Sequence, residues 1–157
     1  MVKNKLFILL FLILCGQSIF ARRAGGSSVS EKPERQVDID FKNAVYKKDF
    51  EAAKKAFKNG ANVNAQDSSG STLLIRKVQD KNQDAIAFLL TNKADVNVRC
   101  GRNLMSALMW AADSCNKDII QLLLKYKADK SATDAYGNTA KSTAMRNQCP
   151  KEVIDLL

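Results

Sequence analysis

The sequence repeats itself with a period of 33 to 34 residues, and this periodicity constrains the fold more than any other feature. Residues 60–64 (GANVN), 93–97 (KADVN) and 127–131 (KADKS) align, and their alanines lie 33 and then 34 residues apart. A repeat of this length is one small unit that buries its apolar face only against its neighbours in a stack. The periodicity therefore predicts a solenoid.

A second marker recurs in phase with the first. Residues 67–72 and 134–139 both read D-x-x-G-x-T, and Ser106 stands at the threonine position between them. Asp-x-x-Gly favours a turn, and Thr or Ser is preferred at the start of a helix. Each unit is therefore predicted to contain a hairpin turn followed by a helix.

Between the markers, each unit contains two apolar segments with helical spacing. In the third unit these are residues 107–112 (ALMWAA) and 118–124 (DIIQLLL), and the second of them carries the apolar pattern of a broad buried stripe. The predicted fold class is all-α, with about four helix-loop-helix units and hairpin turns. The predicted units are residues 38–66, 67–100, 101–133 and 134–157.

These motifs resemble the ankyrin repeat, whose pattern runs roughly D-x-x-G-x-T-P-L-H-x-A-A and then to a second helix ending L-L-x-x-G-A-D-V-N. The resemblance covers residues 38–157. It implies a non-catalytic scaffold that binds a protein partner. Where the family has Pro-Leu-His, the chain reads LLI at residues 73–75 and ALM at 107–109, so apolar packing is expected there. Lys77 falls where the family has a buried alanine, and we expect its amine to reach solvent.

The first 21 residues have the layout of a signal peptide. Lys3 and Lys5 precede an apolar run at residues 6–15, and Ala21 is a small residue suited to cleavage. An exported protein, periplasmic or secreted, is therefore predicted, with no membrane association after cleavage. The alternatives are an uncleaved membrane anchor, although the run is shorter than the ~20 residues of a spanning helix, and lipid attachment at Cys15.

Residues 22–37 are rich in Gly, Ser, Pro and charge, which predicts a flexible linker. A cap that packs on the first helix is the alternative. Removal of residues 1–21 leaves 23 of the 25 basic residues and all 16 acidic residues, a net charge of +7. The chain has no histidine, and no carboxylate pair or nucleophile motif stands out. We therefore expect no enzyme activity, cofactor, metal site or nucleic-acid partner.

The family resemblance implies that partners bind at the hairpin tips and at the exposed ends of the first helices. Arg102, Met105, Tyr136 and Arg146 are expected to be the energetic anchors, because Tyr and Arg are enriched among such residues. Trp110 is expected to pack between repeats. The hairpin positions are Ser68, Ser69, Ser71, Arg102, Asn103, Met105, Ala135, Tyr136 and Asn138, and the helix positions are Gln79, Asp80, Asp113, Ser114, Arg146 and Asn147.

Three cysteines follow the predicted cleavage site. Cys115 and Cys149 lie in the same helix-to-helix loop of adjacent units. Equivalent points of packed elements lie about 10 Å apart, whereas a disulfide needs Cα atoms within roughly 7 Å. An extra residue near Gln148 lets Cys149 lean across this gap, so a Cys115–Cys149 disulfide is predicted for an oxidising compartment. Two free thiols are the alternative.

The leading functional hypothesis is a monomeric, non-catalytic protein-protein interaction scaffold that acts outside the cytoplasm on an unidentified protein partner. A second hypothesis is a secreted effector that binds host proteins. A third, based on the net charge, is a binder of an anionic surface or of nucleic acid, whose affinity would fall steeply with salt.

Overall fold

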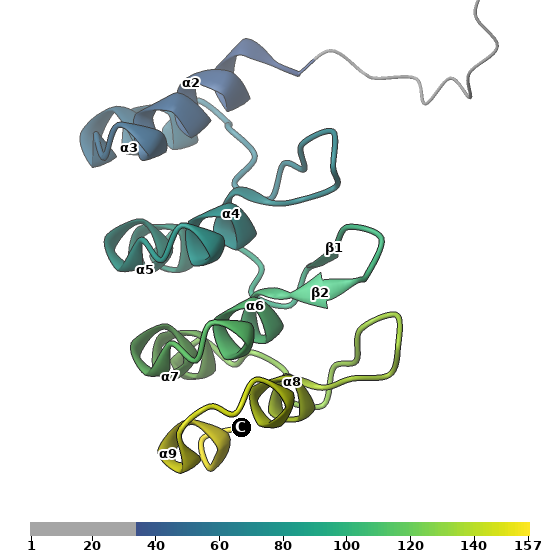
Figure 1. Ribbon diagram of the computed structural model, residues 1–157. Coiled ribbons are helices and arrows are strands. Elements are labelled where there is room, and N and C mark those ends of the chain that lie inside the picture. The colour runs from purple at the N-terminus through teal and green to yellow at the C-terminus, as the bar shows by residue number, and fades with distance from the viewer. Residues whose placement is uncertain (1–33) are drawn as a thin grey trace, which may run out of the picture. The chain divides into compact units, whose positions relative to one another are not determined.

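The computed structural model describes residues 34–157, so the predicted signal peptide and most of the predicted linker lie outside the described residues. Within residues 34–157, antiparallel helix pairs stack one on another (Figure 1). The pairs are α2 (Gln36–Tyr46) with α3 (Phe50–Lys58), α4 (Leu73–Gln79) with α5 (Gln83–Thr91), α6 (Ala107–Asp113) with α7 (Lys117–Lys125), and α8 (Ala140–Arg146) with α9 (Lys151–Ile154). Helix α2 begins at Gln36, so the predicted linker, residues 22–37, extends too far toward the first repeat.

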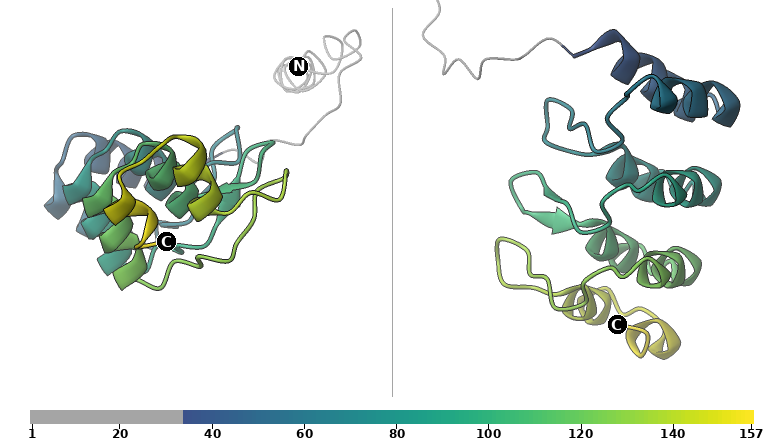
Figure 2. Two further views of the ribbon diagram at one scale, coloured as in Figure 1. Left: turned by 60° about the horizontal axis from the view of Figure 1, so that its bottom comes forward. Right: turned by 180° about the vertical axis from the view of Figure 1, so that it is seen from behind.

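Hairpin loops connect successive pairs and all project from the same side of the stack, as the view from behind also shows (Figure 2). We name them the first hairpin (residues 67–72), the second hairpin (101–106) and the third hairpin (134–139). A short antiparallel ladder closes the second hairpin, between β1 (Arg99–Cys100), which directly precedes it, and β2 (Met105–Ser106), its last two residues. The fold is therefore mostly helical, and the all-α prediction missed this ladder.

Side-chain caps start most of the helices. Thr72, Ser106 and Thr139 each accept a hydrogen bond from the backbone N–H three residues on, at the starts of α4, α6 and α8. The starts of α3, α5 and α7 are capped by Asp49, Asn82 and Asn116 in the same way. Helix α9 differs, because its N-cap is Pro150, which forms no side-chain cap hydrogen bond.

Apolar side chains fill the space between the helix pairs. Ile75 and Met109 stand where the family has histidine, and both are 1% exposed. Apolar packing therefore holds these positions, as expected. Trp110 is partly buried and packs against the core, although its indole Nε1 has no hydrogen-bond partner among the described residues.

Asparagine and aspartate side chains accept backbone hydrogen bonds along one edge. Asp38 Oδ1 accepts the backbone N–H of Asn62 at 2.7 Å. Asn64 Oδ1 accepts the N–H of Asp95 at 2.8 Å, and Asn97 Oδ1 accepts that of Asp129 at 2.9 Å. We call the contacts of Asn64 and Asn97 the asparagine ladder. The two contacts of the asparagine ladder tie one repeat to the next from a side-chain oxygen to a backbone N–H, whereas the contact of Asp38 lies within the first repeat.

Lys77 is the main departure from the expected core. It is 3% exposed, its Nζ donates to Asp80 at 2.6 Å, and Nζ lies 3.5 Å from the centroid of the Tyr46 ring. The expectation that the amine reaches solvent is therefore wrong. The ring of Tyr46, projecting from α2, covers the amine, and its negative face attracts the positive charge.

A disulfide joins Cys115 to Cys149, with Cα atoms 5.3 Å apart. The backbone N–H of Cys149 donates to Ala144 O as that of Asn116 donates to Ala111 O. Cys149 is therefore equivalent to Asn116, one position after the equivalent of Cys115. This offset brings the two cysteines closer together than equivalent points of adjacent repeats.

Candidate protein-interaction surface

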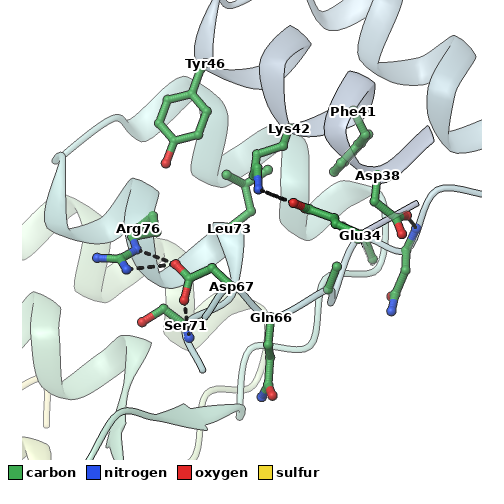
Figure 3. A pocket seen from close by; sticks show the side chains of 13 residues that line it. Glu34, Asp38, Phe41, Lys42, Tyr46, Gln66, Asp67, Ser71, Leu73 and Arg76 are labelled. Carbon is green, nitrogen blue, oxygen red and sulfur yellow. Dashed lines mark hydrogen bonds and ion pairs between the residues drawn. The ribbon is translucent and has the colours of Figure 1, made fainter. Parts of the chain in front are cut away.

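The first hairpin is held together by the carboxylate of Asp67. It accepts hydrogen bonds from the backbone N–H groups of Ser69 and Ser71 at 2.9 and 3.0 Å, and from Arg76 Nε and Nη2 at 2.9 and 2.8 Å (Figure 3). Burial alone raises the pKa of Asp67, but hydrogen bonds from Ser69, Arg76 and Ser71 outweigh it and lower the pKa to about 2. This hairpin is therefore a closed polar turn.

The predicted contact residues of the first hairpin divide into two kinds. Ser68 and Ser69 are exposed at its tip. Ser71 is only 7% exposed, and its Oγ contacts Ser69 Oγ at 3.0 Å and Cys100 Sγ at 3.3 Å. The prediction of Ser71 as a partner-binding residue is therefore corrected, because its hydroxyl is used inside the stack.

The second hairpin exposes Arg102 and Asn103, as the sequence predicted, while Met105 is half-buried. It also exposes Leu104, which the sequence reasoning missed and which is 44% exposed. The hairpin alignment contained the signal for it, because Leu104 lies two residues before Ser106 as Gly70 lies two before Thr72. Leu104 therefore stands where the first hairpin has a turn glycine, and it places an exposed apolar side chain at the tip of the second hairpin.

The third hairpin exposes Ala135 and Tyr136, and Tyr136 is 74% exposed. The backbone N–H of Ala135 donates to Asn103 O at 2.8 Å, and the Tyr136 hydroxyl donates to Asn103 Oδ1 at 3.5 Å. Asn138 is half-buried, and its amide donates to the Asp134 carboxylate. Asn138 therefore stabilises the turn itself, and the second and third hairpins are hydrogen-bonded to each other.

The predicted positions at the ends of the first helices are mostly engaged within the stack. Asp80 pairs with Lys77, and Ser114 Oγ donates to Ala111 O. The Asn147 amide donates to both the backbone O and the carboxylate of Asp113, each at 2.8 Å. Within residues 34–157, the side chains of Gln79 and Arg146 form no hydrogen bond or ion pair and are the free groups of this set.

A shallow pocket of about 120 Å³ lies between the first two repeats (Figure 3). Its charged groups pair with each other, Lys42 with Glu34 at 2.8 Å and Arg76 with Asp67. Burial raises the pKa of Asp38, but hydrogen bonds from Arg35 and the Asn62 N–H lower it overall. Both aspartates therefore stay ionised at neutral pH, which suits structural ion pairs and not proton transfer.

Residues 34–157 contain no group of three or more His, Cys, Asp or Glu side chains that could hold a metal ion. In the same range, no helix combines the length and the apolar character that a membrane span requires.

The model for a family described as ankyrin repeats (3 copies) matches residues 41–134 and 79–157. The chain therefore belongs to the ankyrin-repeat family, whose domains are typically non-catalytic and bind protein partners. It is also similar to the ankyrin repeat and KH domain-containing protein mask-1 of Caenorhabditis elegans, at 25% identity over 105 residues. That similarity covers 66% of this chain but 4% of the relative, so the chain corresponds to a small part of it.

Proposed function

We propose that this protein is a non-catalytic scaffold that acts outside the cytoplasm and binds a protein partner through its hairpins and the free ends of its first helices. The observation that carries the proposal is the single row of hairpins on one side of the stack (Figure 2), with Arg102, Leu104 and Tyr136 exposed at the tips. A repeat array presents such a row as one extended surface.

Two features support action outside the cytoplasm. The disulfide between Cys115 and Cys149 is of a kind that persists in oxidising compartments and is rare in the cytosol. The sequence of residues 1–21, which lie outside the described part of the structure, predicts a signal peptide.

Counting the free thiols of protein purified from its natural source and then denatured tests two features together, removal of the signal peptide and formation of the disulfide. We expect one alkylated cysteine, Cys100, without reductant and three after reduction, because cleavage removes Cys15. Four adducts after reduction would mean that Cys15 is retained, and three without reductant would mean that the disulfide is absent in the cell. Either result contradicts this part of the proposal.

The binding surface is tested by affinity capture with the mature protein and with an Arg102→Ala/Tyr136→Ala variant. Loss of the captured partner is expected, because exposed Tyr and Arg at such positions dominate interface energies. Lys55→Ala, at an exposed position of α3, is the matched control and should retain the partner. Equal capture by all three proteins would move the site away from the hairpins.

A further inference from the structure

Leu104 occupies a backbone conformation that leucine disfavours. Its φ is 54°, and the equivalent residues of the first and third hairpins are Gly70 at 76° and Gly137 at 79°. Residues other than glycine visit this left-handed region at an energetic cost. Leu104 is also 44% exposed, so burial does not compensate for the conformation. Strain of this kind is concentrated at functional sites.

Tyr136 displays a second large side chain on the adjacent tip. Asn103, the residue before Leu104, accepts the backbone N–H of Ala135 at 2.8 Å and the hydroxyl of Tyr136 at 3.5 Å. The second and third hairpins therefore present Leu104 and Tyr136 from a bonded pair of loops. The first hairpin, by contrast, exposes only Ser68 and Ser69.

Among the charged groups beside these two tips, the carboxylates of Asp134 and Asp113 have hydrogen-bond partners, whereas two guanidinium groups have no ion-pair partner in the described part of the chain. The Asp134 carboxylate accepts the backbone N–H groups of Tyr136 and Asn138, both at 2.8 Å, and Asp113 accepts Asn147. The guanidinium groups of Arg102 and Arg146 form no ion pair within residues 34–157. Burial raises the pKa of Asp134, but hydrogen bonds from Asn138 and the nearby charge of Arg146 lower the pKa of that carboxyl overall. The surface therefore offers cations and apolar groups, while its carboxylates are engaged. Free guanidinium groups bind carboxylates in a bidentate manner.

We infer that the second and third hairpins dock an acidic, apolar segment of a partner protein, with Leu104 and Tyr136 contacting its apolar side chains and Arg102 and Arg146 its carboxylates. The inference rests on the proposed function and names the chemistry of the partner. Residues 22–33 of the chain itself (RRAGGSSVSEKP) carry three basic residues and one acidic residue, so they do not fit this surface.

The test is selection of a displayed library of random peptides on the immobilised mature protein. We expect the enriched peptides to combine Asp or Glu with large apolar residues and to lose affinity as salt concentration rises. Enrichment without acidic residues, or no enrichment above an empty support, overturns the inference. The proposed function stands separately, because it depends on capture of a native partner by the surface around Arg102 and Tyr136.

Leu104→Gly separates a docking role from a structural one. The variant restores the residue of the neighbouring hairpins, so thermal stability should be retained or rise, while affinity for a selected peptide should fall about tenfold. Lys55→Ala, at an exposed position of α3 outside the hairpins, is the control and should change neither property. Unchanged peptide affinity in Leu104→Gly, with the fold intact, overturns the role of Leu104.

Discussion

The two ends of the repeat stack are joined by different chemistry. At the N-terminal junction, the Lys77 amine of the second repeat lies under the ring of Tyr46 of the first. At the C-terminal junction, the disulfide of Cys115 and Cys149 joins the repeats covalently. The first junction therefore depends on a noncovalent contact between a cation and an aromatic ring, and the second depends on redox state.

The difference follows from one position in the repeat. Asn82 and Asn116 cap the starts of α5 and α7, whereas the equivalent residue of the last repeat is Cys149. Helix α9 has only four residues and no side-chain cap. The last repeat thus has a crosslink where the internal repeats have a cap.

The largest expected effect is on the C-terminal junction. Replacing both cysteines, Cys115→Ser with Cys149→Ser, should lower the free energy of unfolding by about 4 kcal/mol, as expected for a disulfide closing a loop of this length. Urea unfolding with and without reductant measures the change. Reductant should affect the wild type and leave the double variant unchanged. Equal wild-type stability in both conditions would mean that the crosslink contributes nothing.

The Lys77 contact at the N-terminal junction should give the next largest effect. Tyr46→Ala uncovers a buried amine and should cost about 2 kcal/mol of unfolding free energy. In a Lys77→Met background, which removes the charge and keeps the apolar stem, the same substitution should cost at least about 0.5 kcal/mol less. Chemical denaturation of the four proteins gives the coupling energy. A coupling near zero would show that the ring does not stabilise the amine.

Acid should weaken the first hairpin through Asp67. Because the pKa of Asp67 is lowered from 3.8 to about 2 in the folded protein, its contribution is fully present above pH 3.8 and is lost as the pH falls toward 2. The loss should be about 1–2 kcal/mol, since the carboxylate is partly exposed to solvent. Unfolding measured at pH 6, 4 and 3 should show a weaker pH dependence in Asp67→Asn. An unchanged pH dependence would contradict the role of Asp67.

The smallest effect is expected at the hairpin tips, where the two halves also differ. Leu104→Gly should stabilise the protein by about 1 kcal/mol, because it relieves a left-handed leucine. Gly70→Leu should destabilise it by a similar amount, since an added Cβ meets nothing closer than 4.0 Å and conformation alone sets the cost. Thermal unfolding of both variants measures whether the two changes in stability are opposite in sign and similar in size. Shifts of the same sign would exclude this explanation.

The features that the sequence predicted are those that one repeat determines by itself. Thr72, Ser106 and Thr139 begin helices because a cap needs only the following turn. The repeat period also predicted that Cys115 and Cys149 lie in the same loop of adjacent repeats.

The features that the sequence did not predict depend on contacts with the neighbouring repeat. Ser71 is buried because Cys100 lies against it, and Lys77 is covered because Tyr46 projects from the preceding helix pair. Leu104 was missed because the turn motif of the other hairpins is absent from its own hairpin.

The asparagine ladder restricts the spacing between successive repeats. The side-chain oxygens of Asn64 and Asn97 each accept a backbone N–H of the following repeat, at 2.8 and 2.9 Å, so a side chain of fixed length restricts the distance between repeats at the first two junctions. A ligand that spans two tips is therefore selected by the separation of its own contact points as well as by their chemistry. Flexible ligands lose conformational entropy to match that separation, whereas rigid ligands with the correct spacing bind at little such cost.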